Sequence, residues 1–210
     1  MGRSFTALRY DRPKWTRLLK RSLDIVVGGS LLILTLPLIG MIALAIKLDS
    51  PGPILFRQRR FIQKPFRIYK FRTMFLVACY DPTIRQARRY DPRVTRIGRV
   101  LRRTSLDELP QLFNVIRGDM SLVGPRPHAV AHDKKYASLL GEAYLIRHNA
   151  KPGLTGWAQI NGMRGETANL DQMKRRLEYD RYYIENSTFV LDLQILCKTW
   201  LVFFTRRNAY

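Results

Sequence analysis

The longest hydrophobic stretch of the chain runs from Ile25 to Ile46 and contains no charged residue. At ~1.5 Å per residue, a straight helix of this length reaches roughly 33 Å, enough to cross a bilayer core of about 30 Å. The run is too long for a signal peptide, and no small-residue cleavage site follows it. The pattern therefore predicts a membrane helix.

Two features of this stretch argue against a simple crossing. Pro37 lies in its middle, lacks an N–H and clashes with the carbonyl four residues earlier, so it kinks or breaks a helix. Basic residues flank both ends, and the positive-inside rule then places both ends in the cytoplasm; they are Arg17, Lys20 and Arg21 before the run and Lys47, Arg57, Arg59 and Arg60 after it. We expect a re-entrant helix over 22–48, broken at Pro37. The alternative is a Pro-kinked spanning helix, which would leave most of the basic charge outside.

Short segments of differing periodicity follow a turn cluster at Asp49–Pro53. We expect extended segments at Ile54–Phe56 and Phe66–Phe71, a loop with a helix at 75–92, a glycine-rich loop at Pro152–Gly165, and helices over 97–101, 109–116 and 170–184. The apolar segment Val190–Phe204 fits a helix in the membrane interface or one in a core. No repeat or second-domain boundary is visible. We therefore expect one domain over 1–210: a mainly helical α/β monotopic membrane protein with amphipathic interfacial helices and a small cytosolic part at 49–210.

Composition adds a strong positive charge to this picture. Of the 210 residues 46% are hydrophobic, which suits a real core, and the formal net charge is +21. Such a field attracts nucleic acid, anionic lipid or phosphorylated substrates, and composition alone does not choose among them. Cys79 and Cys197 lack metal-ligand spacing, so we expect reduced thiols, and the three histidines form no zinc motif.

The densest candidate chemistry is the segment Arg102–Pro110, RRTSLDELP. It can be interpreted as a capping box, with Ser105 as N-cap and Glu108 three residues later. Pro110 argues against that arrangement, because it would fall where the helix needs an N–H. A helix that starts at Asp107 instead puts Pro110 in the first turn, where the N–H is unpaired anyway. Two carboxylates then lie at a helix N-terminus, whose positive end favours their ionised form.

Such a pair of carboxylates has a chemical use beside two arginines. An ionised Asp107 can attack a phosphorus atom and form an aspartyl-phosphate intermediate. The charge of a diphosphate opposes that attack, so cations must offset it: guanidinium groups and a divalent metal held by Glu108. We therefore assign Asp107 and Glu108 as catalytic residues and Glu108 as the metal ligand.

Two further segments carry candidate substrate contacts. Arg126 lies between two prolines, which stiffen its loop and present one guanidinium to a phosphate; an ordinary surface arginine is the equal alternative. The segment Gly153–Gly165 offers glycines for close approach, Trp157 for base stacking and Arg164, although an aromatic in a loop is more often a packing anchor. Arg126, Trp157 and Arg164 are therefore substrate-binding candidates.

The motifs together resemble the bacterial sugar transferase family, the monotopic phosphoglycosyl transferases, over about Lys20 to Tyr210. The resemblance lies in KRSLDIVVGG, SPGPILFRQRR, YKFRTM, DPRVTRIGRVLRRTSLDELPQLFNVIRGDMSLVGPRPHAVAH and KPGLTGWAQINGMRGET. PRPHAVAH and INGMRGET are similar to the undecaprenyl-phosphate glucose phosphotransferases of the colanic-acid and xanthan type. Many members have Ser-Pro at the helix break, where this chain has Leu36-Pro37 and so lacks the serine's hydrogen bond. Larger members add an N-terminal four-helix region and a further domain, so we expect a short form or an excised catalytic part.

The resemblance implies a ping-pong reaction dependent on Mg²⁺ (or Mn²⁺) with a covalent phosphosugar on Asp107. Lys70, Arg102 and Arg126 fall where the family places basic groups near its phosphates. With Arg72, Trp157 and Arg164 they make up the set of substrate-binding candidates. The implied partners are a UDP-sugar donor, undecaprenyl phosphate and membrane lipid, at the bacterial inner membrane with the catalytic part facing the cytoplasm; a homodimer stays open. A hexose-1-phosphate, with glucose favoured, would be transferred to begin exopolysaccharide, capsule or O-antigen synthesis.

Two other functional classes compete with this interpretation. A nucleic-acid-binding module would explain the charge, but it should carry a groove-reading or stacking pattern and has no use for a long uncharged run. A non-catalytic membrane scaffold would explain the run, but it has no need of Asp107 and Glu108 beside arginines. We therefore expect a transferase that does not bind nucleic acid.

Overall fold

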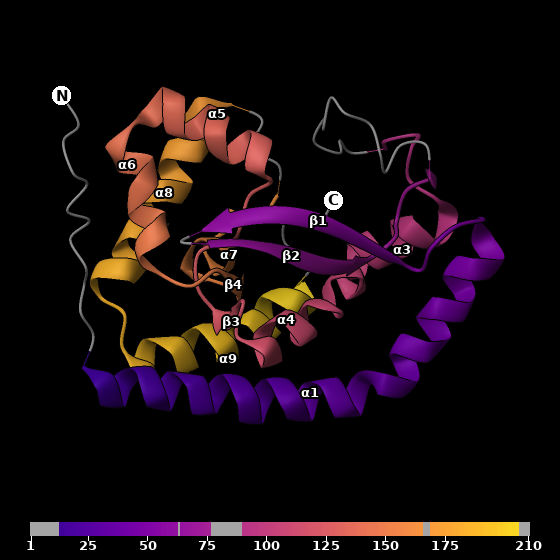
Figure 1. Ribbon diagram of the computed structural model, residues 1–210, viewed down its shortest axis with the longest axis horizontal. Helices are drawn as coiled ribbons and strands as arrows, with labels where there is room; N and C mark the ends of the chain where they lie inside the picture. Colours follow the sequence, from indigo (N-terminus) through magenta and orange to yellow (C-terminus); the bar gives the residue numbers. More distant parts are fainter. Residues whose placement is uncertain (1–12, 63, 77–89, 166–168, 206–210) are drawn as a thin grey trace.

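The computed structural model describes residues 13–62, 64–76, 90–165 and 169–205. The segment 75–92 and Cys79 therefore lie largely or wholly outside the described residues. The first described element is the helix α1, Lys14–Asp49, which begins eight residues before the predicted start at 22 and continues through Pro37. Figure 1 shows α1 running along one side of the molecule and then turning toward β1. The chain thus bends without leaving the helix, where the sequence predicted a break.

The bend in α1 has two physical causes near its middle. Pro37 removes one hydrogen bond of the helical ladder and pushes away the carbonyl four residues before it. Two residues earlier, the Thr35 hydroxyl donates to the Leu31 carbonyl oxygen at 2.7 Å, a bond that also bends helices. Thr35 therefore supplies a hydroxyl close to the proline, although Leu36 stands where many family members have serine.

Most of the apolar surface of α1 faces away from the rest of the protein. Within the described ranges α1 is the one helix long and apolar enough to cross a membrane, and 11% of its most apolar window is buried. Leu34 and Leu48 are 75% and 80% exposed, whereas Ile42 and Ile46 pack against the domain. A row of exposed leucines forms a large apolar surface, which is typical of a protein that associates with a membrane.

A hairpin of two antiparallel strands follows α1. The strands are β1, Leu55–Ile62, and β2, Lys64–Phe71, and their register runs from Leu55↔Phe71 to Ile62↔Lys64. Both strands are longer than the segments predicted from sequence. The difference arises because one face of the hairpin is exposed and rich in arginine. A prediction that relies on apolar residues therefore underestimates the length of the strands.

The centre of the domain contains a second, parallel pair of strands that the sequence did not predict. It joins β3, Ser121–Val123, to β4, Gly153–Thr155. Glycine allows this pairing, because a Cβ at Gly153 would lie 2.1 Å from the Gly124 nitrogen, closer than any side chain is tolerated. The predicted glycine-rich loop therefore begins as a strand.

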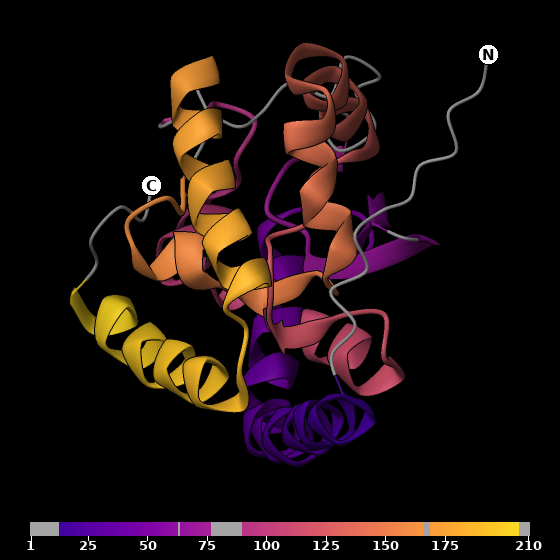
Figure 2. The same cartoon turned by 90° about the vertical axis from the view of Figure 1, so that its left-hand side faces the viewer.

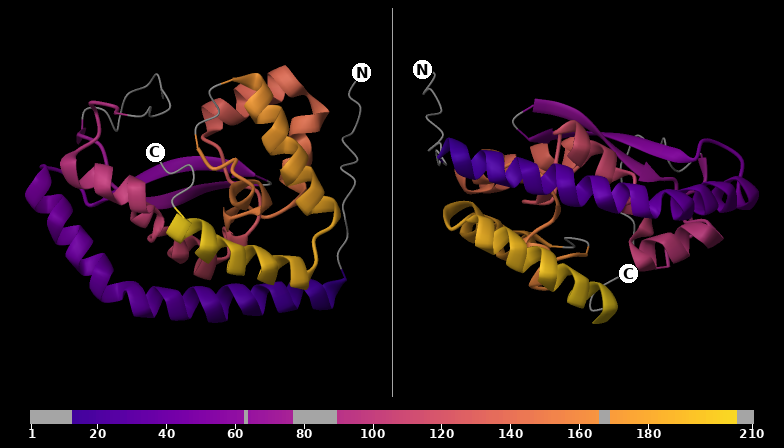
Figure 3. Two further views of the ribbon diagram at one scale, coloured as in Figure 1. Left: turned by 180° about the vertical axis from the view of Figure 1, so that it is seen from behind. Right: turned by 90° about the horizontal axis from the view of Figure 1, so that it is seen from below.

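Helices surround these strands, and four of them lie close to the predicted positions. They are α3, Arg96–Thr104; the 3-10 turn η1, Leu106–Glu108; α4, Gln111–Arg117; α5, Val130–Leu140; α6, Glu142–Leu145; the 3-10 turn η2, Ile146–Asn149; α7, Trp157–Ile160; α8, Leu170–Glu185; and α9, Phe189–Thr205. Figures 2 and 3 show α9 lying beside α1 on the same side of the molecule. Its Ile195 is fully buried while Leu201 is 66% exposed. The helix α9 thus joins the core with one face and leaves an apolar face beside α1.

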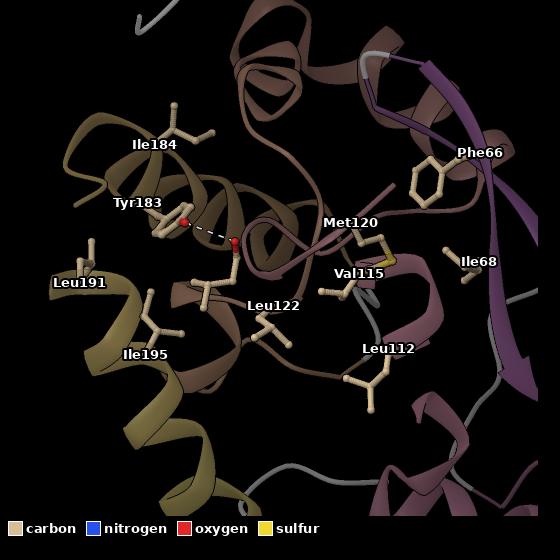
Figure 4. Packing of buried hydrophobic residues seen from close by; sticks show 11 residues of the cluster. Phe66, Ile68, Leu112, Val115, Met120, Leu122, Tyr183, Ile184, Leu191 and Ile195 are labelled. Carbon is tan, nitrogen blue, oxygen red and sulfur yellow. Dashed lines mark hydrogen bonds between the residues drawn. The ribbon is translucent and has the colours of Figure 1, made fainter. Parts of the chain in front are cut away.

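The main core lies between the hairpin, α4, β3, α8 and α9 (Figure 4). Its buried members are Phe66, Ile68, Leu112, Val115, Met120, Leu122, Val123, Tyr183, Ile184, Leu191 and Ile195. Burying each such side chain stabilises the fold by about 1.5–3 kcal/mol relative to leaving it exposed. This core fixes the hairpin against α4, and η1 lies directly before α4.

Candidate active site

A tight backbone turn between α3 and α4 presents the two adjacent carboxylates. Ser105 ends α3 in the left-handed conformation (φ 56°, ψ 17°), and its side chain makes no capping bond to η1. The backbone N–H of Glu108 donates instead to the Ser105 carbonyl at 3.2 Å, so the capping box is absent, as predicted. Pro110 directly precedes α4. Asp107 and Glu108 therefore lie in the 3-10 turn η1 rather than in a helix. The helix α4 begins at Gln111, four residues after the predicted start at Asp107, and Pro110 precedes it instead of lying in its first turn.

Glu108 lies between two cations from different parts of the fold. Lys70 Nζ, on β2, donates to Oε1 at 2.7 Å, while Arg126 Nη1 donates to Oε2 at 3.0 Å and its Nη2 donates to Oε1. Burial by itself would raise the pKa of Glu108, but Arg126 and Lys70 hold it far below its usual range. The predicted residues Lys70, Glu108 and Arg126 are thus brought together, with Glu108 ionised.

Asp107 has a different electrostatic environment although it is the neighbouring residue. It is buried, and its nearest cation is Lys70, whose Nζ lies 4.0 Å from Oδ2. Burial raises the pKa of the Asp107 carboxyl, and the Glu108 charge raises it further, against the opposing effects of Lys70, Arg102 and Arg126. The predicted preference for the ionised form is therefore confirmed for Glu108 and wrong for Asp107, because burial outweighs the cations around Asp107. A carboxylate that is less stabilised is the more reactive of the two toward an electrophile once it is ionised.

Two other predicted arginines also lie near the carboxylates. Arg102 donates from Nε to the Thr73 hydroxyl at 2.8 Å, and its charge lowers the pKa of Asp107. Arg164 donates from Nη2 to the Ser105 hydroxyl. Burial lowers the pKa of Arg164, and the charges of Glu108 and Asp107 act against that shift. The end of the glycine-rich segment is therefore close to the carboxylate turn.

Two predicted substrate contacts have other partners instead. The Trp157 ring stacks on Tyr182 with centroids 5.5 Å apart, and Lys198 Nζ lies 5.5 Å from its centroid, so the ring packs α7 against α8 and α9. Arg72 is buried and donates to the carbonyl oxygens of Ser50 and Pro51 at 2.7 and 2.6 Å. Arg72 thereby ties β2 to the end of α1. Neither side chain joins the carboxylates.

A buried polar network behind Arg126 was not found from the sequence. Arg147 donates from Nε to Asp180 at 2.8 Å and from Nη2 to the Arg126 carbonyl oxygen at 2.6 Å. His128 and the Tyr144 hydroxyl lie 2.9 Å apart in the same network, and burial together with Arg147 lowers the pKa of His128 well below its usual value. The network holds the backbone of the arginine that clamps Glu108. Its members are distributed between Arg126 and Asp180 in the sequence, so no local motif indicates the network.

The donor set of the turn suits a hard divalent cation. Mg²⁺ is usually held by one or two carboxylates plus substrate phosphates, so an adjacent Asp and Glu meet that requirement. Within the described ranges no three side chains of the His, Cys, Asp or Glu type gather as a candidate metal cage. A metal here would therefore depend on Asp107, Glu108 and oxygen atoms of a substrate.

Comparison with known proteins supplies the family. The UDP-glucose:undecaprenyl-phosphate glucose-1-phosphate transferase of Escherichia coli strain K12 is 50% identical over 205 residues, covering 96% of this chain and 44% of that protein. The protein of the same name from Caulobacter vibrioides is 51% identical, covering 91% and 72%. The exopolysaccharide production protein PSS of Rhizobium leguminosarum is 44% identical, covering 91% and 98%.

The chain thus spans less than half the length of the Escherichia coli relative and nearly all of the Rhizobium one. The model of the bacterial sugar transferase family matches residues 15–206, from the start of α1 to the end of α9. The match includes the carboxylate turn and the cations that surround it. This protein is a member of the bacterial sugar transferase family.

Proposed function

We propose that this protein transfers a hexose-1-phosphate, with glucose favoured, from a UDP-sugar to undecaprenyl phosphate and releases UMP. The observation that carries the proposal is the buried Asp107–Glu108 pair, in which Lys70 and Arg126 bind Glu108 while Lys70 lies 4.0 Å from Asp107. The names of the relatives support the donor and acceptor. The product would be the first intermediate of an exopolysaccharide, capsule or O-antigen.

Asp107 acts as the nucleophile in this proposal. One of its oxygen atoms attacks the phosphorus that bears the sugar, the bond to the bridging oxygen breaks, and UMP leaves with the bonding electrons. The phosphate oxygen of undecaprenyl phosphate then attacks the same phosphorus, and Asp107 departs as the carboxylate. Each half-reaction exchanges one P–O bond for another, so no oxidant or further reactant is needed.

The cations around Glu108 offset the charge of the donor. Lys70 and Arg126 already bind a carboxylate, so they are preorganised for phosphate oxygens, and preorganised cations need little rearrangement when charge develops. A divalent cation, Mg²⁺ or Mn²⁺, would be held by Glu108 and would neutralise phosphate charge and stabilise the leaving oxygen. Excess chelator should therefore abolish turnover of a UDP-sugar, and added Mg²⁺ should restore it.

The acceptor would reach the site from the membrane, with α1 entering and leaving the bilayer on the cytoplasmic side. The basic residues on both flanks of the apolar run and the bend in α1 support this topology. The exposed apolar face of α9 beside α1 suits the same bilayer surface. This arrangement puts the carboxylate turn in the cytoplasm at the inner membrane, where UDP-sugars are available.

The covalent step gives a direct test. The protein incubated with UDP-glucose and Mg²⁺ alone should release UMP and carry a hexose-phosphate on the peptide that contains Asp107, as detected by mass spectrometry. Asp107→Asn should lose both, whereas Asp171→Asn, a change at an exposed aspartate of α8, should keep both. Substantial turnover by Asp107→Asn, or UMP release only when the lipid acceptor is present, would rule out the covalent mechanism.

A further inference from the structure

The hairpin carries two cations on the face that looks toward the carboxylate turn. The register pairs Lys70 with Phe56 and Arg60 with Phe66, and residues opposite each other in an antiparallel pair share a face. Phe66 and Ile68 on this face are buried in the core. Arg60 therefore points to the same side as Lys70, whereas its neighbour Arg59, paired with Arg67, points to solvent and is exposed.

The side chain of Arg60 is half-buried, and two of its nitrogen atoms are buried without a hydrogen-bond partner among the described residues. Within the described residues, neither Nε nor Nη1 finds an acceptor, and both are closed off from solvent. Burial and the nearby charge of Arg126 lower the pKa of Arg60 to about 9, while Glu108 and Asp133 act in the opposite direction. A buried donor without an acceptor costs about 1–3 kcal/mol, and more when it is charged.

The carboxylates near Arg60 are already engaged by other groups. Glu108 accepts from Lys70 and Arg126. Asp133 accepts from the Tyr144 hydroxyl at 2.6 Å and contacts His148 at 3.3 Å. The backbone of Arg60 forms a bridge with Ala129, which anchors the Arg126 loop to β1 but uses none of the guanidinium N–H groups. Among the described residues, therefore, neither a side chain nor a backbone carbonyl accepts a hydrogen bond from Nε or Nη1 of Arg60.

We propose that Arg60, together with Arg126, binds the phosphate of the donor diphosphate that Asp107 does not attack. The ligand assignment rests on the proposed function. Lys70 lies 4.0 Å from Asp107 and binds Glu108, and Arg126 binds Glu108 as well. Arg60 lies on the same face of the hairpin as Lys70, on the strand that bridges to Ala129 in the Arg126 loop. A diphosphate needs cations at two successive positions. Lys70 serves the attacked phosphorus, and Arg60 serves the phosphate that leaves with the nucleoside.

The N–H groups on Nε and Nη1 of Arg60 lack acceptors among the described residues, and they suit phosphate oxygens. Charge-assisted hydrogen bonds from a guanidinium to phosphate are about twice as strong as neutral hydrogen bonds. The leaving phosphate gains negative charge as the bridging bond breaks, so a cation at that phosphate stabilises the transition state as well as the bound donor. Arg60 is thus a binding and leaving-group residue in the same reaction.

Inorganic pyrophosphate tests the subsite without requiring turnover. Its affinity for the detergent-solubilised full chain is measured by calorimetry at about 0.15 M salt, where exposed charges are screened beyond about 8 Å. Arg60→Gln should weaken binding by about tenfold or more, and Arg60→Lys by less, since the charge remains but the guanidinium donors are lost. Arg59→Gln, the exposed neighbour on the same strand, is the matched control and should stay within about twofold of the parent protein.

Thermal unfolding separates binding from folding. Arg60→Gln removes a desolvated charge, so without ligand its Tm should equal or exceed that of the parent, while the rise in Tm on adding pyrophosphate should be lost. A lower Tm without ligand, or undiminished pyrophosphate binding, would overturn the proposal even if UDP-glucose is turned over normally. Loss of pyrophosphate binding in Arg60→Gln but not in Arg59→Gln would support the phosphate subsite. Failure of the parent protein to release UMP from any UDP-sugar would then contradict the proposed function without contradicting the subsite.

Discussion

Asp107 and Glu108 are neighbours in sequence, yet their carboxyl groups have opposite pKa shifts. Glu108 accepts from Lys70 and from both terminal nitrogens of Arg126, and these bonds outweigh its burial. Asp107 has Lys70 only at 4.0 Å, so burial dominates. Paired carboxylates pushed apart in this way commonly divide one reaction between two roles. In the proposed function, Glu108 is the fixed charge that organises the cations, and Asp107, which has Lys70 only at 4.0 Å, is the nucleophile.

This division predicts how Asp107→Asn affects stability. A carboxyl whose folded pKa is raised binds its proton more tightly in the folded state, so ionising it as the pH rises removes stability. Asn resembles the protonated form and does not titrate. Asp107→Asn should therefore raise Tm at pH 8, and the gain should shrink toward zero as the pH falls below the raised pKa of Asp107. The measurement is thermal unfolding in detergent from pH 4 to pH 8; a Tm gain that grows as the pH falls would contradict it.

The helix α3 is placed by a contact that only glycine permits. A Cβ at Gly98 would lie 2.1 Å from the Thr73 carbonyl oxygen. Thr73 also accepts from Arg102 through its hydroxyl and bonds through its backbone oxygen to the N–H of Thr95 at 3.1 Å. The approach of α3 to the end of the hairpin thus fixes both the turn that follows it and the cation beside Asp107.

Gly98→Ala should therefore separate α3 from the hairpin. We expect a loss of stability of about 1–3 kcal/mol, as for other overpacked sites, together with lower turnover, because Arg102 and the carboxylate turn move with the helix. Gly29→Ala is the matched control, since its Cβ would make an ordinary contact of 3.8 Å with Ile116. Equal stability and turnover in the two variants would show that the contact at Gly98 does not position the site.

The bend of α1 predicts a membrane topology that labelling can measure. In a background with Cys79→Ser and Cys197→Ser, single cysteines at the exposed positions Trp15 and Arg57 should both react from the cytoplasmic face. Pro37→Leu restores the lost helical hydrogen bond, so it should straighten the helix and move one label to the outer face. Thr35→Val should shift the labelling less, because it removes only the bond to Leu31. Labelling from opposite faces in the parent protein would exclude the re-entrant model.

The spacing of apolar residues predicted the long helices, whereas the short strands depend on contacts between distant segments. The segments 97–101, 109–116, 170–184 and 190–204 lie within or almost within α3, α4, α8 and α9, because an amphipathic helix announces its buried face every three or four residues. Strands of three residues carry no such signal, so β3 and β4 were missed. The same limit applies to the site: Arg59 and Arg60 look alike in sequence, and only the register of the hairpin turns one inward.

Buried polar contacts join the helix α1 to the helix α9 and to β3. Lys20 Nζ, on α1, lies 2.7 Å from Asp192 Oδ2, on α9, and also donates to the Val123 carbonyl oxygen of β3 at 3.0 Å. The Tyr183 hydroxyl donates to the other oxygen of Asp192 at 2.6 Å. Asp24 of α1 accepts from the Leu122 N–H and the Ser121 hydroxyl at 2.8 and 2.9 Å. The long apolar helix α1 is therefore joined to the rest of the folded domain by buried polar contacts as well as by packing.

A mutant cycle on Lys20 and Asp192 tests this closure. Removing one partner leaves the other charge buried, so Lys20→Met or Asp192→Leu alone should each cost about 3–5 kcal/mol of unfolding free energy, whereas the double variant should recover most of that loss. The exposed pair Asp171–Lys174, whose side chains are 82% and 56% exposed, is the control; breaking it should cost at most about 1 kcal/mol. Unfolding is followed in detergent by tryptophan fluorescence and by proteolysis between α8 and α9. If the double variant loses the sum of the two single losses, Lys20 and Asp192 are not coupled, and the attachment of α9 to α1 rests on its apolar contacts alone.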